Sequence, residues 1–342
     1  MQEILYDLQV NHTENCPVFV LGHGRSGTSI LIKLIRKYLK VNFGTESQFI
    51  VRYYKSLKNY GDIKKDDNLK RLIIDLSKER WFKRVKKRFG FEPDLTDLFL
   101  SIKERTYRGV LDAIFEQFAT YHGMERWGDK TPEYIYDLPV LNKLFPEAKY
   151  IHIVRDGRDV ALSEFKTQFG AKNIYKAAEE WKRKVGLIHE FGSLLPAERY
   201  CEIRYEDFLS RPSDVFQKLI SFLKIANDDQ VVQFIEKNIS SDLKRGNFYK
   251  WKNELDRSQR RIFEREAGDF LRYYNYENEY NLLPKIKNLE KAIWELDNFV
   301  RRKFRINFWQ DNLYRLNIRF HHFFSAFRKH KTSNTKIELS QQ

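Results

Sequence analysis

The segment from Pro17 to Ser29, which reads PVFVLGHGRSGTS, constrains the fold more than any other part of the sequence. It begins with the apolar run Val18 to Leu21, which is typical of a strand buried on both faces. Glycines follow at positions 22, 24 and 27, and the apolar residues after Ser29 recur at helical spacing. The segment therefore predicts a strand, a glycine turn and a helix that begins at Thr28 and Ser29.

A turn of this kind can bind an anion. The first amides of a helix have no partners within the helix, the helix dipole adds positive potential, and glycines let the backbone approach an oxyanion. The spacing of Gly22 and Gly27 matches the first part of the nucleotide-phosphate loop, but Thr28 stands where that loop has its lysine. Arg25 supplies a cation in the turn instead, and its planar fork suits an oxyanion. A glycine turn that binds nothing remains the alternative at this point.

The composition indicates what kind of partner to expect. The 342 residues have a formal net charge of +15, which predicts a nucleotide, a sulfated or phosphorylated substrate, a nucleic acid or an anionic lipid surface. Only two cysteines are present, which argues against a disulfide framework and fits a reducing compartment. No apolar run is long enough to span a bilayer, and residues 1–16 have no signal-peptide core. We therefore expect a cytoplasmic protein, with peripheral membrane contact left open.

Strand-like segments alternate with helical ones along the chain, which predicts an α/β fold with a parallel sheet. After the first strand, the expected strands are 40–43, a strand that ends near Asp129, 149–154 and 199–204. In such a sheet, ligands bind beyond the carboxyl ends of the strands. Arg25, Lys130, Arg155 and Tyr205 all fall at these ends.

Two segments stand apart from this alternation. Residues 52–122 are helical in pattern and strongly basic, either as a solvated helical face or as an insertion that recruits an anionic acceptor. Residues 285–342 carry 13 Lys and Arg against 5 Asp and Glu, a net charge of +8. Their apolar residues form a helical stripe of Trp309, Leu313, Leu316, Phe320, Phe323 and Phe327. We expect a domain at 1–284 and a basic helical tail at 285–342, which packs on the domain or a second copy, or lies on a membrane or an acidic partner.

Four motifs follow one another along the chain: Gly24 to Ser29, Arg155 with Ser163 eight residues later, Tyr205 to Asp207, and Lys244 to Gly246 followed by Trp251. Together they resemble the sulfotransferases that use 3′-phosphoadenosine-5′-phosphosulfate (PAPS). In that family these motifs bind the 5′-phosphosulfate, the 3′-phosphate and the adenine, and the last one closes over the 3′-phosphate. The resemblance assigns the donor nucleotide to Arg25, Ser26, Gly27, Thr28, Ser29, Arg155, Ser163, Tyr205, Lys244, Arg245 and Gly246.

The resemblance covers roughly residues 17–276 and implies a three-layer fold like that of nucleotide kinases, with a helical insertion at about 52–122 and the C-terminal helical tail. It also implies PAPS as the sulfuryl donor and the 3′,5′-bisphosphate (PAP) as the product. A donor with two anionic ends requires two cationic clusters, which the sequence offers. Sulfuryl transfer needs positioning and charge neutralisation, which lysine and arginine can provide, so no metal is expected.

The resemblance is nearer to the carbohydrate and protein-tyrosine branches than to the cytosolic small-molecule branch. The loop carries Arg25 where the small-molecule branch has lysine, and the turn at Lys130 lacks that branch's catalytic histidine. In the tyrosine branch, a glutamate 21 residues after the loop arginine is the general base, and this position is Glu46. The expected catalytic residues are Glu46, Arg25 and Lys130. A surface role remains the alternative for Glu46, and His23 and Asp129 are the next candidates for the base.

The sequence thus favours transfer of a sulfuryl group from PAPS to a hydroxyl acceptor, with a carbohydrate or glycolipid foremost and no nucleic-acid partner. A kinase that uses a nucleoside triphosphate is the first alternative, and Thr28 in place of the loop lysine counts against it. A non-catalytic protein that binds membranes or polyanions is the second. It would explain the charge but not the four ordered motifs.

Overall fold

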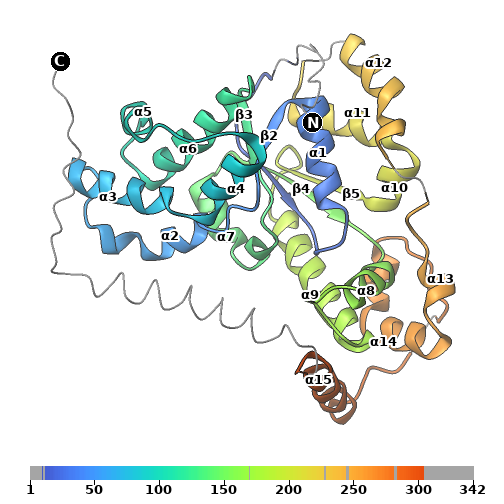
Figure 1. Cartoon of the computed structure of the whole chain (residues 1–342). Helices are drawn as coiled ribbons and strands as arrows, with labels where there is room; N and C mark the ends of the chain where they lie inside the picture. The colour runs from blue at the N-terminus through green and yellow to red at the C-terminus, as the bar shows by residue number, and fades with distance from the viewer. Residues whose placement is uncertain are drawn as a thin grey trace, which may run out of the picture. The chain divides into compact units, whose positions relative to one another are not determined.

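The computed structural model describes residues 10, 12–168, 170–226, 229–243, 246–280 and 283–303. Within these ranges five strands form one sheet, and every neighbouring pair is parallel. Their spatial order is β2 (Val41–Phe43), β3 (Arg126–Asp129), β1 (Val18–Leu21), β4 (Lys149–Val154) and β5 (Tyr200–Arg204). Figure 1 labels β2, β3, β4 and β5 among the helices around them. The expected α/β fold with a parallel sheet is confirmed.

The sheet is covered on both faces, because successive side chains of a strand point to opposite sides. Phe19 of β1 and Tyr150 of β4 are buried in one core. Val18, Val20 and Ile151 from the same two strands are buried in the other. Parallel sheets usually have both faces buried in this way. The result is the three-layer architecture that the sequence predicts.

Helices supply the two outer layers. One core also contains residues of α1 (Thr28–Leu39), α10 (Tyr205–Ser210), α11 (Pro212–Leu223) and α12 (Asp229–Asn238). The opposite core contains residues of α2 (Ile50–Ser56), α3 (Asp66–Ser77), α4 (Arg80–Phe89), α5 (Leu95–Ser101), α6 (Tyr107–Tyr121), α7 (Leu138–Leu144) and α9 (Ile174–Ser193). A third cluster joins α9 to α8 (Gly157–Phe165), α13 (Trp251–Glu254) and α14 (Arg257–Tyr273). Single 3₁₀ segments lie at η1 (Leu57–Tyr60), η2 (Pro132–Tyr136) and η3 (Ile239–Asp242).

The basic segment 52–122 forms helices, as expected, and these helices build part of the fold. Trp81, Phe82 and Val85 of α4 are buried in the same core as Phe19. The lysines and arginines of α4 occupy its exposed face. The segment is therefore a structural layer on one face of the sheet whose outer surface carries the positive charge.

The first compact unit of the chain spans residues 1–298 and so extends past the expected boundary at 284. The helix α15 (Asn288–Lys303) begins in this unit, and its residues up to Asn298 are held near the start of α9. Asn173 Nδ2 donates to Trp294 O at 2.7 Å and to Asp297 Oδ2 at 2.8 Å, and Lys172 N donates to Asn298 Oδ1 at 2.8 Å. The second unit spans 299–342, of which the structure describes 299–303.

The predicted apolar stripe from Trp309 to Phe327 lies outside the described residues. Among the helices that are described, none combines the length and the apolar character needed to cross a bilayer.

Candidate active site

All the strands are parallel, so their carboxyl ends meet at one edge of the sheet, and the residues expected to be functional lie there. The glycine turn follows β1, Glu46 lies after β2, and Lys130 follows β3 directly. Arg155 follows β4, and Tyr205 follows β5. The turn after the central strand β1 thus separates residues on the β2 and β3 side from residues on the β4 and β5 side. Ligands of open parallel sheets bind at such an edge.

The turn from Gly22 to Gly27 is compact and depends on its glycines. A Cβ on Gly22 would lie 2.8 Å from the carbonyl oxygen of Ile153, and one on Gly27 would lie 2.4 Å from the Tyr205 ring. Gly27 also has φ of 90°, which disfavours other residues. No side chain in the described part of the chain caps the start of α1, so its first amides remain available to an anion.

Four expected donor-binding residues converge beside this turn. Arg25 Nε donates to Ser163 Oγ at 2.9 Å. Arg155 NH1 donates to the carbonyl oxygen of Arg25 at 3.0 Å, and its guanidinium carbon lies 4.6 Å from the centre of the Tyr205 ring. Residues that follow β1, β4 and β5 are therefore brought into one group with Ser163 of α8.

The group lines a cavity of about 430 Å³. Of the expected residues, Arg25, Gly27, Thr28, Ser29, Arg155, Ser163 and Tyr205 line it. The sequence reasoning missed a further set, which consists of Ile30, Asp159, Leu162, Lys166, Asn247, Lys250 and Glu254. For three of these residues, the position in the sequence could have indicated a place at the cavity. Asn247 and Lys250 lie within the late motif, and Lys166 follows Ser163 by nearly one helical turn.

The late motif is only partly described. Gly246 has φ of 76°, and Lys244 and Arg245 lie outside the described residues. Asp159 anchors the segment that follows, because its carboxylate accepts from Tyr249 N at 2.7 Å and from Trp251 N at 3.0 Å. Arg155 NH2 adds a bond of 2.9 Å to Asn247 O. The segment after Gly246 is thus fixed against the start of α8.

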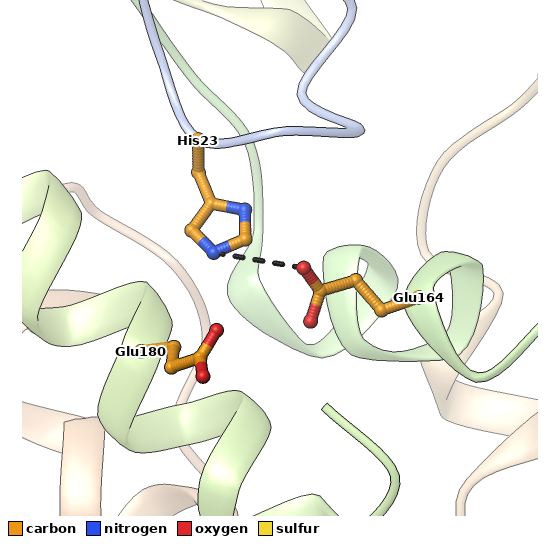
Figure 2. Close-up of side chains that lie close together, drawn as sticks. All are labelled: His23, Glu164 and Glu180. Atoms are coloured by element: carbon orange, nitrogen blue, oxygen red, sulfur yellow. Dashed lines mark ion pairs between the residues drawn. The ribbon is translucent and has the colours of Figure 1, made fainter. Parts of the chain in front are cut away.

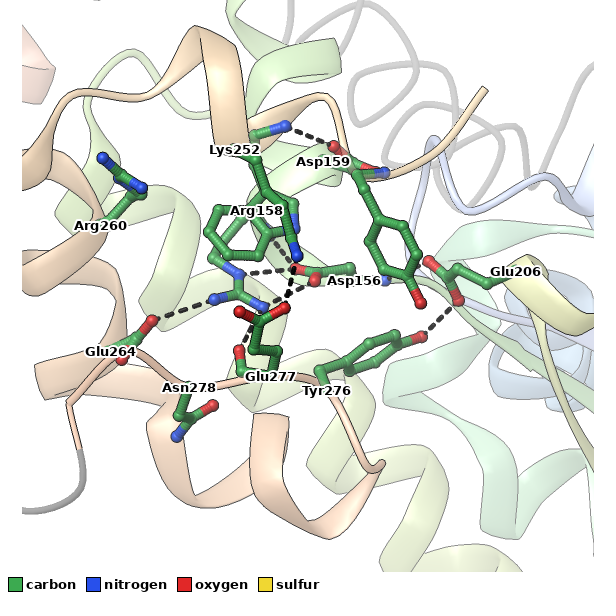
Figure 3. A network of polar contacts seen from close by, with 12 residues as sticks. Asp156, Arg158, Asp159, Glu206, Lys252, Arg260, Glu264, Tyr276, Glu277 and Asn278 are labelled. Carbon is green, nitrogen blue, oxygen red and sulfur yellow. Dashed lines mark hydrogen bonds and ion pairs between the residues drawn. The ribbon is translucent and has the colours of Figure 1, made fainter. Parts of the chain in front are cut away.

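A buried ionic network lies behind this segment (Figure 3). Arg158 donates to both carboxylate oxygens of Asp156, at 3.0 and 2.8 Å, and to Glu264 Oε1 at 3.0 Å. Its guanidinium carbon lies 3.5 Å from the centre of the Trp251 ring. Glu206 extends the network by accepting from Asp156 N at 3.0 Å, and burial raises the pKa of Glu206 to about 7.

Glu46 and Lys130 form a separate pair on the β2 and β3 side. Lys130 Nζ lies 2.5 Å from Glu46 Oε1. The Lys130 side chain is 10% exposed and the Glu46 side chain 33%, so the carboxylate remains open to an incoming group. The structure brings together two of the three expected catalytic residues. The guanidinium of the third, Arg25, hydrogen-bonds Ser163 on the donor-binding side.

His23, a reserve candidate for the base, is buried inside the turn (Figure 2). Its Nδ1 pairs with the carbonyl oxygen of Gly24 at 2.8 Å, and its Nε2 lies 3.5 Å from Lys184 Nζ. Burial, and next the charge of Lys184, lowers the pKa of His23 to about 3. The imidazole is therefore neutral and enclosed, which suits a structural role.

Among the described residues, His23, Glu164 and Glu180 offer ligand atoms that all lie within 4.8 Å of one another. The cluster already contains a cation. Lys184 Nζ lies 3.7 Å from Glu180 Oε2 and 3.5 Å from His23 Nε2. Burial raises the pKa of Glu164 to about 7, which the Lys184 charge opposes. His23 of the turn, Glu164 of α8, and Glu180 and Lys184 of α9 thus hold these three segments together. We assign no metal to the cluster.

Residues 17–229 match the model of the sulfotransferase family, which is more than half of the chain. The chain belongs to the sulfotransferase family. The predicted family is thereby confirmed, and the matched residues include the first three of the four motifs.

Curated relatives of this sulfotransferase-family chain are distant. A Drosophila melanogaster protein-tyrosine sulfotransferase is 22% identical over 230 residues, which cover 64% of this chain and 41% of that protein. The omega-hydroxy-beta-dihydromenaquinone-9 sulfotransferase Stf3 of Mycobacterium bovis is 24% identical over 178 residues, 48% of this chain and 44% of that protein. An uncharacterized Aquifex aeolicus protein is 23% identical over 65% of this chain and 27% of its own length. The chain thus spans between about a quarter and about half of these relatives.

Solved sulfotransferase structures also match this family member. The sulfotransferase domain of the Synechococcus PCC 7002 olefin synthase has a TM-score of 0.48 and 19% identity, and it covers 81% of this chain and 100% of its own. The sulfotransferase domain from the curacin biosynthetic pathway has a TM-score of 0.43 and 18% identity, with 83% and 97% covered.

Proposed function

We propose that this protein transfers a sulfuryl group from PAPS to a hydroxyl acceptor. One observation carries the proposal: Arg25, Arg155, Ser163 and Tyr205 converge on one cavity beside an uncapped helix N-terminus. These residues come from three separate motifs of the sequence, each of which resembles a motif of the sulfotransferase family, to which the chain belongs. The Glu46–Lys130 pair follows β2 and β3, on the other side of β1 at the same sheet edge.

The cavity suits a nucleotide with a phosphate at each end of its ribose. Arg155 has five N–H donors, and its described hydrogen bonds go only to Arg25 O and Asn247 O. Among the described residues, its buried Nε has no hydrogen-bond partner, and neither has the buried hydroxyl of Ser26 in the turn. Unsatisfied buried donors of this kind are costly, and an anionic ligand would satisfy them. Lys166 and Lys250 add positive charge to the cavity wall.

The transfer forms a bond from the acceptor oxygen to sulfur and breaks the bond from sulfur to the oxygen of the 5′-phosphate. We assign the acceptor's proton to the Glu46 carboxylate, which is partly exposed, and charge neutralisation around the sulfuryl group to Lys130 and Arg25. Lys130 holds Glu46 in place through their 2.5 Å contact. Arg25 bonds Ser163 through its Nε, and we assign its remaining N–H groups to the sulfuryl oxygens.

The broad class of acceptor that we propose is a compound with a free hydroxyl group. The named relatives act on protein tyrosine and on an omega-hydroxy menaquinone derivative, so a hydroxyl is the group common to both. Within this class we propose a carbohydrate or glycolipid, because Arg25 and the Lys130 turn resemble the carbohydrate and tyrosine branches. A contact of the basic tail with a membrane or a second copy remains part of the proposal.

A labelled donor tests the function directly. The full chain is incubated with ³⁵S-labelled PAPS and a panel of oligosaccharides, glycolipids, tyrosine peptides and hydroxylated quinols, without added metal. We expect label on one acceptor class and release of PAP in equal amount. In parallel, calorimetry compares PAP with ATP and magnesium. Preference for ATP with magnesium would support a kinase, and binding of neither nucleotide would support a non-catalytic protein.

A further inference from the structure

Asp129 is the last residue of β3 and immediately precedes Lys130. Its side chain is almost fully buried, with 2% exposed. Two hydroxyls meet on the same carboxylate oxygen: Ser47 Oγ donates to Asp129 Oδ2 at 2.9 Å, and Thr131 Oγ1 donates to it at 2.8 Å. Ser47 follows Glu46 in the sequence, and Thr131 follows Lys130. The carboxylate therefore joins the two backbone segments that carry the Glu46–Lys130 pair.

The hydrogen bonds around Asp129 run in one consistent direction. A hydroxyl has one hydrogen to donate, and that of Ser47 goes to Asp129, so Tyr134 donates to Ser47 across their 2.8 Å contact. The Tyr134 hydroxyl in turn accepts from Ile50 N at 3.0 Å, at the start of α2. In a second branch, Ser47 N donates to Thr131 Oγ1 at 3.0 Å. Both branches end on Asp129 Oδ2, which is the acceptor that the whole network requires.

We propose that Asp129 is a positioning residue that fixes Glu46 against Lys130 by accepting the hydroxyls of Ser47 and Thr131. The inference rests on the proposed function, because it assigns a purpose to the geometry of the proposed base. It also gives Asp129 a role other than that of an alternative base. The Asp129 carboxylate is buried, and its Oδ2 accepts hydrogen bonds from two hydroxyls. The Glu46 side chain, in contrast, is 33% exposed.

The network meets the physical requirements of a positioning device. The loop between β2 and α2 contains Gln48, whose φ of 58° is unusual for a residue other than glycine. Such a loop keeps its shape only where its surroundings determine it. Burial raises the pKa of Asp129 to about 6, while the bonds from Thr131 and Ser47 oppose that rise. Near neutral pH the group is thus an acceptor for both hydroxyls.

The experiment separates position from charge. Asp129→Ala removes the acceptor, whereas Asp129→Asn can keep an oxygen in the place of Oδ2 and removes only the charge. We expect Asp129→Ala to lower kcat by about 10- to 100-fold, as misplacement of reacting groups by about 1 Å does. Its affinity for PAP should stay within about twofold of the wild type. Asp129→Asn should recover most of the lost turnover.

A double-mutant cycle with Glu46→Gln tests whether Asp129 acts through Glu46. Once Glu46→Gln has removed the base, Asp129→Ala should lower the remaining rate by less than about threefold. Equal losses in both backgrounds would overturn the inference, and so would normal turnover in Asp129→Ala. Thr131→Val keeps the side-chain shape, breaks one branch, and supplies the measurement if Asp129→Ala does not fold.

A matched control is Asp112→Ala on α6, a carboxyl whose pKa burial also raises to about 6 and which pairs with Arg108. It should lower stability without changing the turnover of folded protein, and a loss of turnover equal to that of Asp129→Ala would contradict a specific role for Asp129.

The experiments distinguish failure of the proposed function from failure of this inference. A wild type that transfers no sulfuryl group overturns the function and this inference together. An active wild type with a slow Glu46→Gln variant but a normal Asp129→Ala variant overturns only the inference.

Discussion

At the scale of single residues, Arg155 has structural contacts in addition to the role in binding that we propose for it. Its guanidinium hydrogen-bonds the carbonyl oxygens of Arg25 and Asn247, so it joins the glycine turn to the late segment. It also lies against the ring of Tyr205. Removal of Arg155 would therefore disturb three neighbouring segments as well as any phosphate contact. Ser163, whose hydroxyl accepts one bond from Arg25, offers a cleaner test of the 3′-phosphate site.

Ser163→Ala should weaken PAP binding selectively. A hydrogen bond to a charged group contributes about 1.5–3 kcal/mol, which corresponds to roughly 10- to 150-fold in Kd. Adenosine 5′-monophosphate lacks the 3′-phosphate, so its affinity should not change. Isothermal titration of both ligands checks this, with Ser193→Ala at the exposed end of α9 as the control variant. Equal weakening of both ligands would show that Ser163 does not contact the 3′-phosphate.

His23 should make folding sensitive to acid. Its pKa falls from the ordinary value of 6.5 to about 3 in the folded protein, because the imidazole is buried and lies near Lys184. The unfolded chain then binds the proton first, so the stability that neutral His23 contributes is present above pH 6.5 and is lost as the pH falls toward 3. Glu164, with its raised pKa, acts in the opposite direction between pH 7 and 4.5. A comparison of the wild type with His23→Asn isolates the histidine.

We expect the free energy of unfolding of the wild type to fall more steeply between pH 6.5 and 4 than that of His23→Asn, by up to about one proton per molecule. Urea unfolding at half-unit pH steps measures both slopes. Parallel slopes would mean that His23 takes up its proton in the folded state as readily as in the unfolded chain.

At the scale of elements, the strand ends were predictable because parallel strands place their carboxyl ends together. A buried apolar run and close glycines located the turn after β1, and β-branched residues located β4 before Arg155. Contacts between distant segments left no such local signal. Arg158 and Glu264 bond across 106 positions in the sequence, and Asp159 and Trp251 bond across 92. In residues 52–122 the many lysines and arginines obscured a second pattern. Trp81 and Val85 are spaced as on one face of a helix, and this face is buried.

The buried ion pairs of Arg158 should contribute far more to the free energy of unfolding than the exposed pair of Lys252 and Glu277. Arg158→Met keeps the stem of the side chain but leaves Asp156 and Glu264 without their cation, and breaking a buried pair costs about 3–5 kcal/mol. Lys252 pairs with Glu277 at the surface, with 44% and 61% of their side chains exposed. Lys252→Met should therefore cost about 0–1 kcal/mol.

Urea unfolding of the two variants measures the difference between these costs. Arg158→Met should also weaken PAP binding, because Trp251 loses the guanidinium packed on its ring and follows directly on the segment 247–250, which contributes Asn247 and Lys250 to the cavity. Losses of similar size in the two variants would indicate that the network around Arg158 does not hold the fold together.

At the scale of the whole molecule, the positive charge is divided among the tail, the exposed face of α4 and the cavity. Residues 285–342 hold +8 of the formal net charge of +15. Other cations lie on the exposed face of α4, whose buried face packs into the core. The cavity that we propose for the donor is lined by Arg25, Arg155, Lys166 and Lys250, among other residues. A role for the tail in association can therefore be separated from nucleotide binding, provided that the chain is cut at a suitable place.

The structure indicates where that cut belongs. A deletion of 285–342, at the boundary expected from sequence, would remove α15 and with it Trp294, Asp297 and Asn298, the partners of Asn173 and Lys172 at the start of α9. A deletion of 304–342 leaves these bonds in place. We expect the shorter deletion to unfold at the same urea concentration as the full chain and to bind PAP with the same affinity. The longer deletion should unfold at a lower urea concentration, because α9 carries residues of two cores.

The same pair of deletions tests the association of the tail, which the sequence predicts from its charge and its apolar stripe. The full chain should sediment with anionic liposomes or scatter light as a larger species, and the chain without 304–342 should do neither, because it lacks most of the basic and aromatic residues of the tail. Repetition of the liposome assay at high salt distinguishes charge attraction, which salt screens, from apolar insertion. Identical behaviour of the two chains in both assays would remove association from the functions of the tail. A loss of PAP affinity on deletion of 304–342 would instead show that residues beyond Lys303 support the donor cavity.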